Sequence, residues 1–202
     1  MEPLIDWIPK HSIRPTGIIH VGASLGEERE IYRSLTDRVI WFEANPDLIT
    51  MLRLNVTPLG HDVIHSAVGN RSGTVTFNVA SFYQSSSILP LGAHFTYYPG
   101  ITYIKQVEVP INRLDYFMAD RPVHDMLYMD VQGYEGQVLE GSLQTLRNVK
   151  WIYTEYNQEE MYLGCWTLPK LMTWLYTWGF RLIDIAFLHP GWGDALFLRV
   201  EP

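Results

Sequence analysis

Three acidic residues stand at the ends of short apolar runs, where their side chains are placed to take part in chemistry. Glu43 closes one such run, at 39–43, Asp130 lies near the end of a second, and Glu155 lies near the end of a third. If the runs are parallel strands, their carboxyl ends meet at one edge of a sheet, where ligands bind. We therefore expect Asp130 and Glu155 to face one cleft. Because an unpaired charge among apolar residues is costly, Asp130 should be paired, bind a cation or lie near a cationic ligand, unless it only caps the next turn.

A glycine turn with the sequence GASLG precedes the first of these acids. Gly22 and Gly26 let the backbone pass close to a ligand, and the helix expected after them presents free N–H groups. The spacing is G-x-x-x-G, not the G-x-G-x-x-G of dinucleotide-binding folds, and no phosphate-binding lysine follows. Glu43 comes about 20 residues after Gly22, a spacing at which an acid accepts hydrogen bonds from both hydroxyls of a ribose. Together the turn and the acid favour a nucleoside site over a purely structural turn.

Alternating strands and helices must position these residues. Apolar runs and alternation predict strands at 17–22, 39–43, 62–68, 73–79, 103–109, 126–131, 151–156, 181–187 and 195–200. Helical patterns predict helices at 26–35, 46–55, 114–119, 135–146 and 168–178. The alternation predicts an α/β fold with a mostly parallel sheet covered by helices on both faces. The last two strands have no helix between them and should form an antiparallel hairpin at one edge.

Composition narrows the class of protein. A length of 202 residues is typical of one domain, and we expect a single domain over 1–202. The one cysteine, Cys165, excludes an internal disulfide framework. No apolar run approaches the ~20 residues of a membrane span, and the start of the chain lacks a signal-peptide pattern, so we expect a cytoplasmic protein. A net charge of −7 with scattered basic residues argues against duplex nucleic acid as a partner. The 12 tyrosines and 7 tryptophans suit carbohydrate or ring-shaped ligands, although an aromatic-rich core is the favoured explanation.

Taken together, the motifs resemble those of the FkbM-type methyltransferases, a family of class I enzymes that use S-adenosylmethionine. The resemblance spans about 18–198 and is carried by IIHVGASLGEE, WFEANP, SAVGNRSGTVTFNV followed by SSSIL, VPINRLDYF, LYMDVQGYEGQVLEGSLQTL and IYTEYNQEEMYLGC. It implies a Rossmann-like sandwich with a seven-stranded sheet. It also implies methyl transfer to a hydroxyl of a sugar or glycan, with S-adenosylhomocysteine as product, by an enzyme fused to or acting with glycosyltransferases.

Other functions stay open at this point. The acceptor can instead be a hydroxyl of a polyketide, a lipid or another small molecule, or an amine. A non-catalytic nucleoside-binding domain is a different class of protein with the same motifs. A nicotinamide-dependent oxidoreductase is disfavoured by the spacing of the glycines.

The resemblance also implies which residues hold the cofactor. The set is His20, Gly22, Ala23, Ser24, Gly26, Glu43, Asn45, Ser66, Ala67, Ser86, Ser87, Asp130 and Val131. The glycine turn would surround the methionine part, and Glu43 would hold the ribose with Asn45 beside it. Many members of the family have an aspartate where this chain has His20, which can hydrogen-bond but supplies no fixed negative charge.

The remaining cofactor contacts are implied in pairs. The pair at 66–67 would flank the adenine, and the pair at 130–131 would border the methyl group. The pair at 86–87 would close over the site from the segment 81–100, which shows little periodicity. A loop of that length in a compact domain is usually functional or mobile.

Methyl transfer to an alcohol requires a group that accepts the hydroxyl proton, since a protonated alcohol is a poor nucleophile. The candidates are Asp130, Glu155, Asp194 and His189. We favour Asp130 and Glu155 because they come from neighbouring strand ends. The same two carboxylates can instead bind Mg or Mn, which lowers the pKa of a bound alcohol. No His/Cys cluster indicates zinc.

Overall fold

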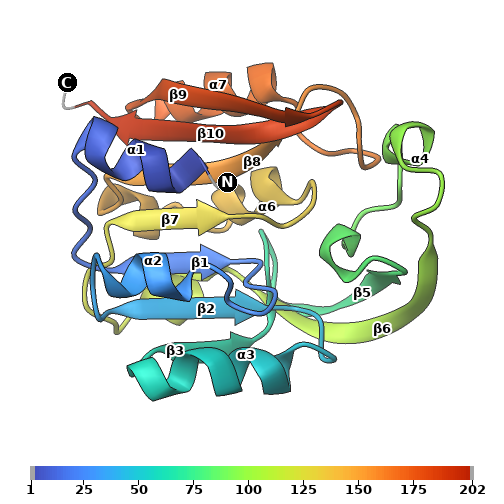
Figure 1. Ribbon diagram of the computed structural model, residues 1–202, viewed down its shortest axis with the longest axis horizontal. Helices are drawn as coiled ribbons and strands as arrows, with labels where there is room; N and C mark the ends of the chain where they lie inside the picture. Colours follow the sequence, from blue (N-terminus) through green and yellow to red (C-terminus); the bar gives the residue numbers. More distant parts are fainter. Residues whose placement is uncertain (1–2, 201–202) are drawn as a thin grey trace.

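The central element is a seven-stranded sheet whose strands follow the order β3-β2-β1-β7-β8-β10-β9 (Figure 1). The computed structural model describes residues 3–200. The strands of this sheet are β1 (Ile18–Val21), β2 (Val39–Glu43), β3 (Asp62–His65), β7 (Met126–Met129), β8 (Trp151–Asn157), β9 (Phe180–His189) and β10 (Trp192–Arg199). The strands from β3 to β8 pair in parallel, whereas β10 is antiparallel to both β8 and β9. The mostly parallel sheet and the C-terminal hairpin are therefore confirmed.

The hairpin differs from the expectation in one detail. The antiparallel strand β10 lies between β8 and β9, so the edge strand β9 runs parallel to the rest of the sheet. Burial explains this order. Five successive residues of β10 are buried, whereas β9 is mostly half-buried or exposed, and the more apolar strand occupies the inner position.

A second sheet of three strands lies beside the first, which the sequence did not predict. It consists of β4 (Ala67–Val68), β5 (Gly73–Ala80) and β6 (Tyr103–Asn112) in the order β4-β6-β5. The strand expected at 62–68 is wrong as one element, because the chain leaves the central sheet at Ser66 and continues in the small one. In Figure 1, β5 and β6 extend beyond the carboxyl ends of the central strands and carry helix α4 (His94–Tyr97).

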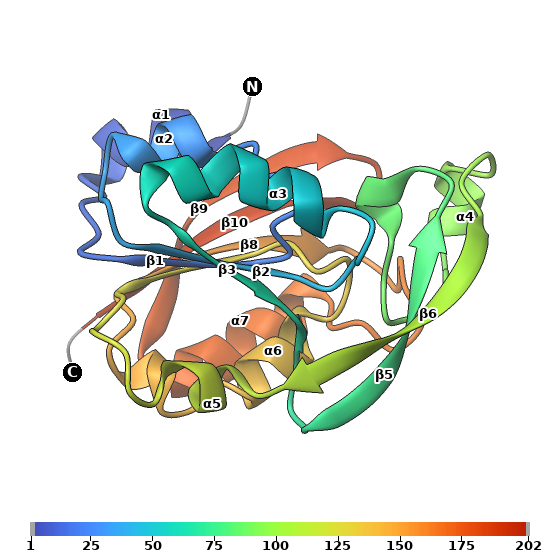
Figure 2. The same cartoon turned by 90° about the horizontal axis from the view of Figure 1, so that it is seen from below.

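Helices cover both faces of the central sheet, as expected. Figure 2 shows α1 (Pro3–His11), α2 (Arg29–Arg33) and α3 (Ile49–Val56) on one face, and α5 (Leu114–Met118), α6 (Glu135–Glu140) and α7 (Leu168–Thr177) on the other. Short 3-10 turns occupy Thr57–Leu59, Tyr83–Ser85 and Thr145–Arg147. Of the helices formed by residues 3–200, none is long and apolar enough to cross a membrane.

Several helix boundaries correct the expectations. Helix α1 was not expected, and α2 and α3 begin three residues later than the patterns at 26–35 and 46–55 indicated. The helix expected at 135–146 ends at Glu140. At the end of the helix the backbone packs directly against another segment, since a Cβ on Gly141 would lie 1.9 Å from the carbonyl oxygen of Gly69.

Alternating side chains of each strand divide the core into two layers. On β1, Ile19 and Val21 pack in the layer under α5, α6 and α7. Ile18 packs in the opposite layer, which contains Trp41 and the apolar side chains of α1, α2 and α3. Both faces of the central sheet are therefore covered by packed side chains, which leaves the ends of the strands as the place for a ligand site.

Candidate active site

A cavity of about 800 Å³ lies at the carboxyl edge of the central sheet. Its wall is formed by the segments after β1, β2, β3, β7 and β8, by the long connection between β5 and β6, and by the β9–β10 hairpin. The volume falls in the range of small-molecule and cofactor sites. The position agrees with the rule that ligands of parallel α/β sheets bind beyond the carboxyl ends of the strands.

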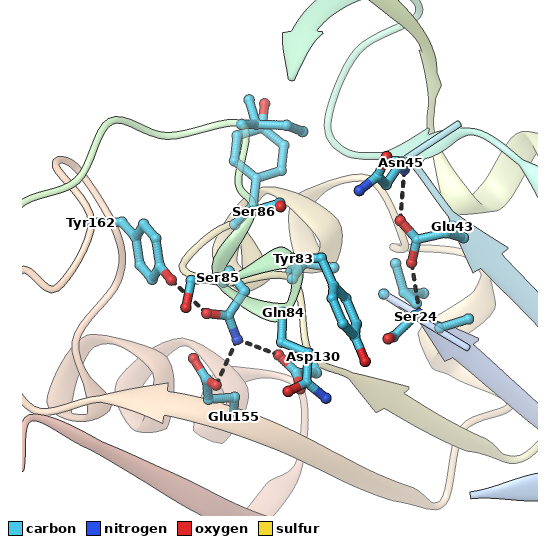
Figure 3. Close-up of a pocket in the computed structure, with 18 of the residues that line it drawn as sticks. Ser24, Glu43, Asn45, Tyr83, Gln84, Ser85, Ser86, Asp130, Glu155 and Tyr162 are labelled. Atoms are coloured by element: carbon cyan, nitrogen blue, oxygen red, sulfur yellow. Dashed lines mark hydrogen bonds between the residues drawn. The ribbon is translucent and has the colours of Figure 1, made fainter. Parts of the chain in front are cut away.

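The glycine turn and Glu43 form one wall of this cavity. The backbone N–H of Ser24 donates to Oε2 of Glu43 at 2.7 Å, and that of Asn45 donates to Oε1 at 2.6 Å (Figure 3). The carboxylate is buried, and burial raises its pKa to about 7, an effect that the backbone hydrogen bonds oppose. Gly22 has a φ of +90°, and a Cβ there would lie 1.8 Å from the carbonyl oxygen of Asp130. The turn therefore requires glycine both for its conformation and for its close approach to the neighbouring loop.

Asp130 and Glu155 lie together, as the sequence predicts, and one amide joins them. Nε2 of Gln132 donates to Oδ1 of Asp130 at 2.7 Å and to Oε2 of Glu155 at 2.9 Å (Figure 3). Its Oε1 accepts a hydrogen bond from the hydroxyl group of Tyr162. Gln132 adopts a φ of +53°, a left-handed conformation that is uncommon for a residue other than glycine. Asp130 itself follows β7 and does not lie inside the strand, which corrects the expected strand at 126–131.

Two further carboxylates surround this pair. Asp194 on β10 stands opposite Glu155 on β8 and accepts a hydrogen bond from the hydroxyl group of Tyr153. Oε1 of Glu135 accepts the backbone N–H groups of Val131 at 3.1 Å and Gly133 at 3.3 Å, which fixes the loop after β7. Burial raises the pKa of Glu135 to about 7. Burial, together with the neighbouring acids, raises the pKa of Glu155 well above its usual range.

The segment 81–100 contributes to the cavity along its length, from Phe82 to Tyr98. Tyr83, Gln84, Ser85 and Ser86 line the cavity (Figure 3). The hydroxyl of Ser86 accepts the backbone N–H of Ala80 at 3.0 Å, which holds the segment in a compact turn.

Three of the expected cofactor contacts, His20, Gly26 and Ser87, lie outside the cavity wall. Strand alternation directs His20 into the core layer under α1, α2 and α3. There its ring lies 4.9 Å from that of Trp41 and 4.2 Å from that of Tyr128, and Nδ1 lies 3.0 Å from the hydroxyl of Tyr32. Burial lowers the pKa of His20 to about 3, so the ring is neutral.

Gly26 and Ser87 have structural positions instead. Gly26 closes the glycine turn by donating its N–H to the carbonyl of Ala23 at 2.8 Å. A Cβ on Gly26 would lie 2.7 Å from Cγ1 of Val56, so the turn packs tightly on α3. The hydroxyl of Ser87 donates to the carbonyl of Gln132 at 2.7 Å and ties the long segment to the loop after β7.

The other expected residues line the cavity. They are Gly22, Ala23, Ser24, Glu43, Asn45, Ser66, Ala67, Ser86, Asp130, Val131, Glu155, His189 and Asp194. Among them His189 is exposed, and its ring stacks on Trp192 with centroids 4.6 Å apart. His189 is therefore an exposed residue of the cavity wall whose ring lies against that of Trp192.

Sequence reasoning missed several residues of the wall. The sequence could have indicated Gln132, since it lies two positions after Asp130 in the same motif. Asn157 follows Glu155 by two positions on the same strand, and strand alternation would have placed it on the same face. Nothing local to Tyr162 or Trp192 indicates that they reach the cavity, because both arrive there through long-range packing.

The wall of the cavity is rich in acidic side chains. It carries Glu27, Glu28, Glu43, Asp130, Glu155 and Asp194, and within the described residues no lysine or arginine lines it. Such a wall favours a cationic ligand and disfavours the pyrophosphate of a dinucleotide. Over residues 3–200, no group of three or more His, Cys, Asp or Glu side chains is arranged to hold a metal ion.

Comparisons with known proteins agree with this geometry. The family pattern described as "Methyltransferase FkbM domain" matches residues 20–182. The 2-O-methyltransferase NoeI of Sinorhizobium fredii (strain NBRC 101917 / NGR234) is 27% identical over an alignment of 159 residues, and the alignment covers 73% of this chain and 65% of that protein. This chain thus matches less than two thirds of the length of NoeI.

Solved structures with the same fold include two methyltransferases. Magnesium protoporphyrin IX methyltransferase of Synechocystis PCC 6803, solved with bound S-adenosylmethionine, aligns with a TM-score of 0.56 at 7% identity over 98% of this chain and 77% of its own. TrmK of M. capricolum, solved with S-adenosylhomocysteine, aligns with a TM-score of 0.51 at 10% identity over 91% of this chain and 62% of its own. At these identities the likeness establishes the class I methyltransferase fold and nothing about the acceptor.

Proposed function

The chain belongs to the FkbM family of S-adenosylmethionine-dependent methyltransferases, and we propose that its acceptor is a hydroxyl group of a sugar or glycan. The observation that carries the proposal is a pair of carboxylates, the half-buried Asp130 and the buried Glu155, joined by one amide in the wall of an acidic cavity. A hydroxyl needs such a group to accept its proton during methyl transfer. The relative NoeI is itself named as a 2-O-methyltransferase, which supports an oxygen acceptor.

The residues of the glycine turn fit the cofactor. Both oxygens of Glu43 are oriented by backbone N–H groups, and the carboxylate retains lone pairs for the two hydroxyls of a ribose. Gly22 allows the turn to pack against the backbone of Asp130, where a Cβ would clash, so that the turn and the loop after β7 both line the cavity. Asn45 lies beside the ribose position, and the pair at 66–67 lines the adjoining wall, where an adenine would lie. The acidic wall complements the positive charge of a sulfonium.

The acids divide the work of handling the proton. Bound S-adenosylmethionine supplies an electrophilic methyl group. Burial and neighbouring acids raise the pKa of Glu155, which favours its protonated form. We therefore favour Asp130, the less buried of the two acids, as the acceptor of the hydroxyl proton. Gln132 keeps both carboxylates in place through its amide.

The supply of the acceptor follows from its chemistry. If the acceptor is a glycan, a glycosyl-transfer reaction must first build it. This enzyme would therefore act after, or together with, glycosyltransferases.

Calorimetric titration of S-adenosylhomocysteine tests the cofactor site. We expect the wild-type protein to bind it and Glu43→Gln to bind it about 100-fold more weakly, because the substitution removes the charge and replaces one acceptor oxygen by an NH2 group that cannot accept a ribose hydroxyl. The matched control is Glu108→Gln, an exposed glutamate on β6 that accepts a hydrogen bond from Thr76, and its affinity should equal the wild type. Binding of NAD in place of S-adenosylhomocysteine would contradict the assignment.

Methyl transfer to sugars tests the acceptor. The assay follows radiolabelled methyl groups from S-adenosylmethionine to methyl α-glycosides of glucose, mannose and galactose, with a simple lipid alcohol as the comparison. We expect transfer to at least one glycoside and none to the lipid alcohol. Strong cofactor binding combined with transfer to the lipid alcohol alone would reject the sugar acceptor and leave the methyltransferase assignment in place.

A further inference from the structure

The pairing of β8 with β10 presents four side chains to the cavity in two rows. Glu155 stands opposite Asp194, and two residues further along the strands Asn157 stands opposite Trp192. Residues two apart on a strand share one face, and all four side chains belong to the cavity wall. The two rows are separated by about 6.6 Å along the strands, roughly the width of a sugar ring. One row carries the acids, and the other carries an amide and an indole.

Asn157 has unused hydrogen-bonding capacity. Its side chain is 1% exposed, and neither Nδ2 nor Oδ1 has a hydrogen-bond partner among residues 3–200. Buried polar groups are normally satisfied, since leaving them without partners costs stability. An amide in this state in the wall of a cavity is suited to bind polar groups of a ligand. With donors and an acceptor on one plane, it matches two neighbouring hydroxyls.

A second buried group at this end of the cavity is also without a partner. His94 on α4 is 5% exposed and lines the cavity, and its Nδ1 has no hydrogen-bond partner in the described part of the chain. The ring lies 5.0 Å from that of Tyr98 and 5.4 Å from that of Tyr162. The same end of the cavity therefore offers two buried polar side chains, from separate elements, without internal partners.

Trp192 supplies a rigid apolar plane beside these groups. Its Nε1 donates to the hydroxyl of Tyr98 at 3.3 Å, and its ring stacks on His189. The indole is half-buried and held in place by both contacts. An aromatic plane next to hydrogen-bonding side chains matches a sugar, which has an apolar ring face and polar hydroxyls at its edge.

We propose that Asn157 and Trp192 form the acceptor subsite, in which Asn157 binds the hydroxyl that neighbours the methylated one. The inference rests on the proposed function and deepens it. The acid row with Glu155 lies at the reacting hydroxyl, and the amide row selects acceptors with a second hydroxyl beside it. Asn157 is thus a specificity-determining residue, and monodeoxy sugars that lack the neighbouring hydroxyl are poor acceptors.

The test combines a variant with a changed substrate. We measure the melting temperature, the affinity for S-adenosylhomocysteine, and KM and kcat for the methyl glycoside that the wild type accepts and for its monodeoxy analogues. Asn157→Leu removes the amide at similar volume, and Asn148→Leu, at an exposed asparagine, is the control. For Asn157→Leu we expect unchanged cofactor affinity, a melting temperature that is not lowered, and a KM for the glycoside raised by about 10- to 100-fold.

The substrate arm identifies the hydrogen bond directly. The wild type should discriminate against one monodeoxy glycoside by a similar factor, and Asn157→Leu should no longer discriminate against it. If Asn157→Leu does not fold, the subsite is tested by comparing the wild type with Asn157→Ser. The wild type should discriminate against the monodeoxy glycoside, and Asn157→Ser should not. Equal KM values for Asn157→Leu and the wild type, or a lowered melting temperature with unchanged discrimination, overturn the subsite and leave the sugar acceptor standing. Cofactor binding without transfer to any glycoside overturns both.

Discussion

Gln132 should contribute to stability through its side chain while its backbone conformation opposes stability. The side chain makes three hydrogen bonds, to Asp130, Glu155 and Tyr162, and two of them go to acids, the half-buried Asp130 and the buried Glu155. Gln132→Ala removes all three and leaves these groups without that partner. Since an unsatisfied buried group costs about 1–3 kcal/mol, and losses within one network are not additive, we expect a destabilisation of about 2–4 kcal/mol.

The backbone adds a second, opposite effect that a glycine variant isolates. The φ of Gln132 is +53°, a region that costs a residue with a Cβ about 1 kcal/mol or more relative to glycine. Gln132→Gly loses the same hydrogen bonds but relieves this strain. It should therefore be more stable than Gln132→Ala by about 1 kcal/mol, or roughly 2–4 °C in melting temperature for a domain of this size.

The assay is urea unfolding of both variants, with a matched pair on a regular helix. Met172 is an exposed, unbranched residue inside α7. There the order must reverse, and Met172→Gly should be less stable than Met172→Ala by about 1 kcal/mol. Equal stability of the two Gln132 variants, or the same order at both sites, would refute the left-handed conformation. A loss below 1 kcal/mol in Gln132→Ala would refute the hydrogen-bonded network.

Three further predictions concern pH, packing and metals. Burial raises the folded-state pKa of Glu43 from 4.5 to about 7, so between these values the folded protein holds a proton that the unfolded chain has lost. The free energy of unfolding should fall as pH rises through this window, by up to about 3 kcal/mol from this group. His20, whose pKa is lowered from 6.5 to about 3 on folding, acts in the opposite direction. The acids of the site with a raised pKa outnumber this histidine. Urea midpoints at pH 5, 6 and 7 should fall less steeply in Glu43→Gln than in the wild type, and equal slopes would contradict the assignment. Gly22→Ala should destabilise the protein far more than Gly60→Ala in thermal unfolding: both have positive φ, but a Cβ meets backbone at 1.8 Å in the first case and nothing within 4 Å in the second. The rate of methyl transfer should be the same with EDTA as with added Mg or Mn, because the amide of Gln132 lies between the two carboxylates that a cation would bridge. A loss of activity in EDTA that Mg or Mn restores would instead support a metal at this pair.

The amino-acid sequence by itself determined the elements whose signals are local. The strand expected at 39–43 agrees with β2 to the residue, since a short apolar run bounded by polar residues has few other solutions. The glycine turn, Glu43 and the acids after two apolar strands were also visible in the sequence, because ligand sites of parallel sheets lie at the strand ends whatever the rest of the chain does. The family motifs gave the same fold.

The tertiary structure decided how side chains turn and which distant residues meet. The pleat of β1 directs His20 into the core under α1 to α3 and away from the cavity, although the family resemblance implied a cofactor contact for it. The break at Ser66, which sends 67–68 into a second sheet, depends on pairing with β6 at 111–112. Tyr162 meets Gln132 only after β7 and β8 pair, and Trp192 stands opposite Asn157 only after β8 and β10 pair. These contacts join residues 30 or more positions apart, and such pairs are set by packing of the whole chain, which no local pattern encodes.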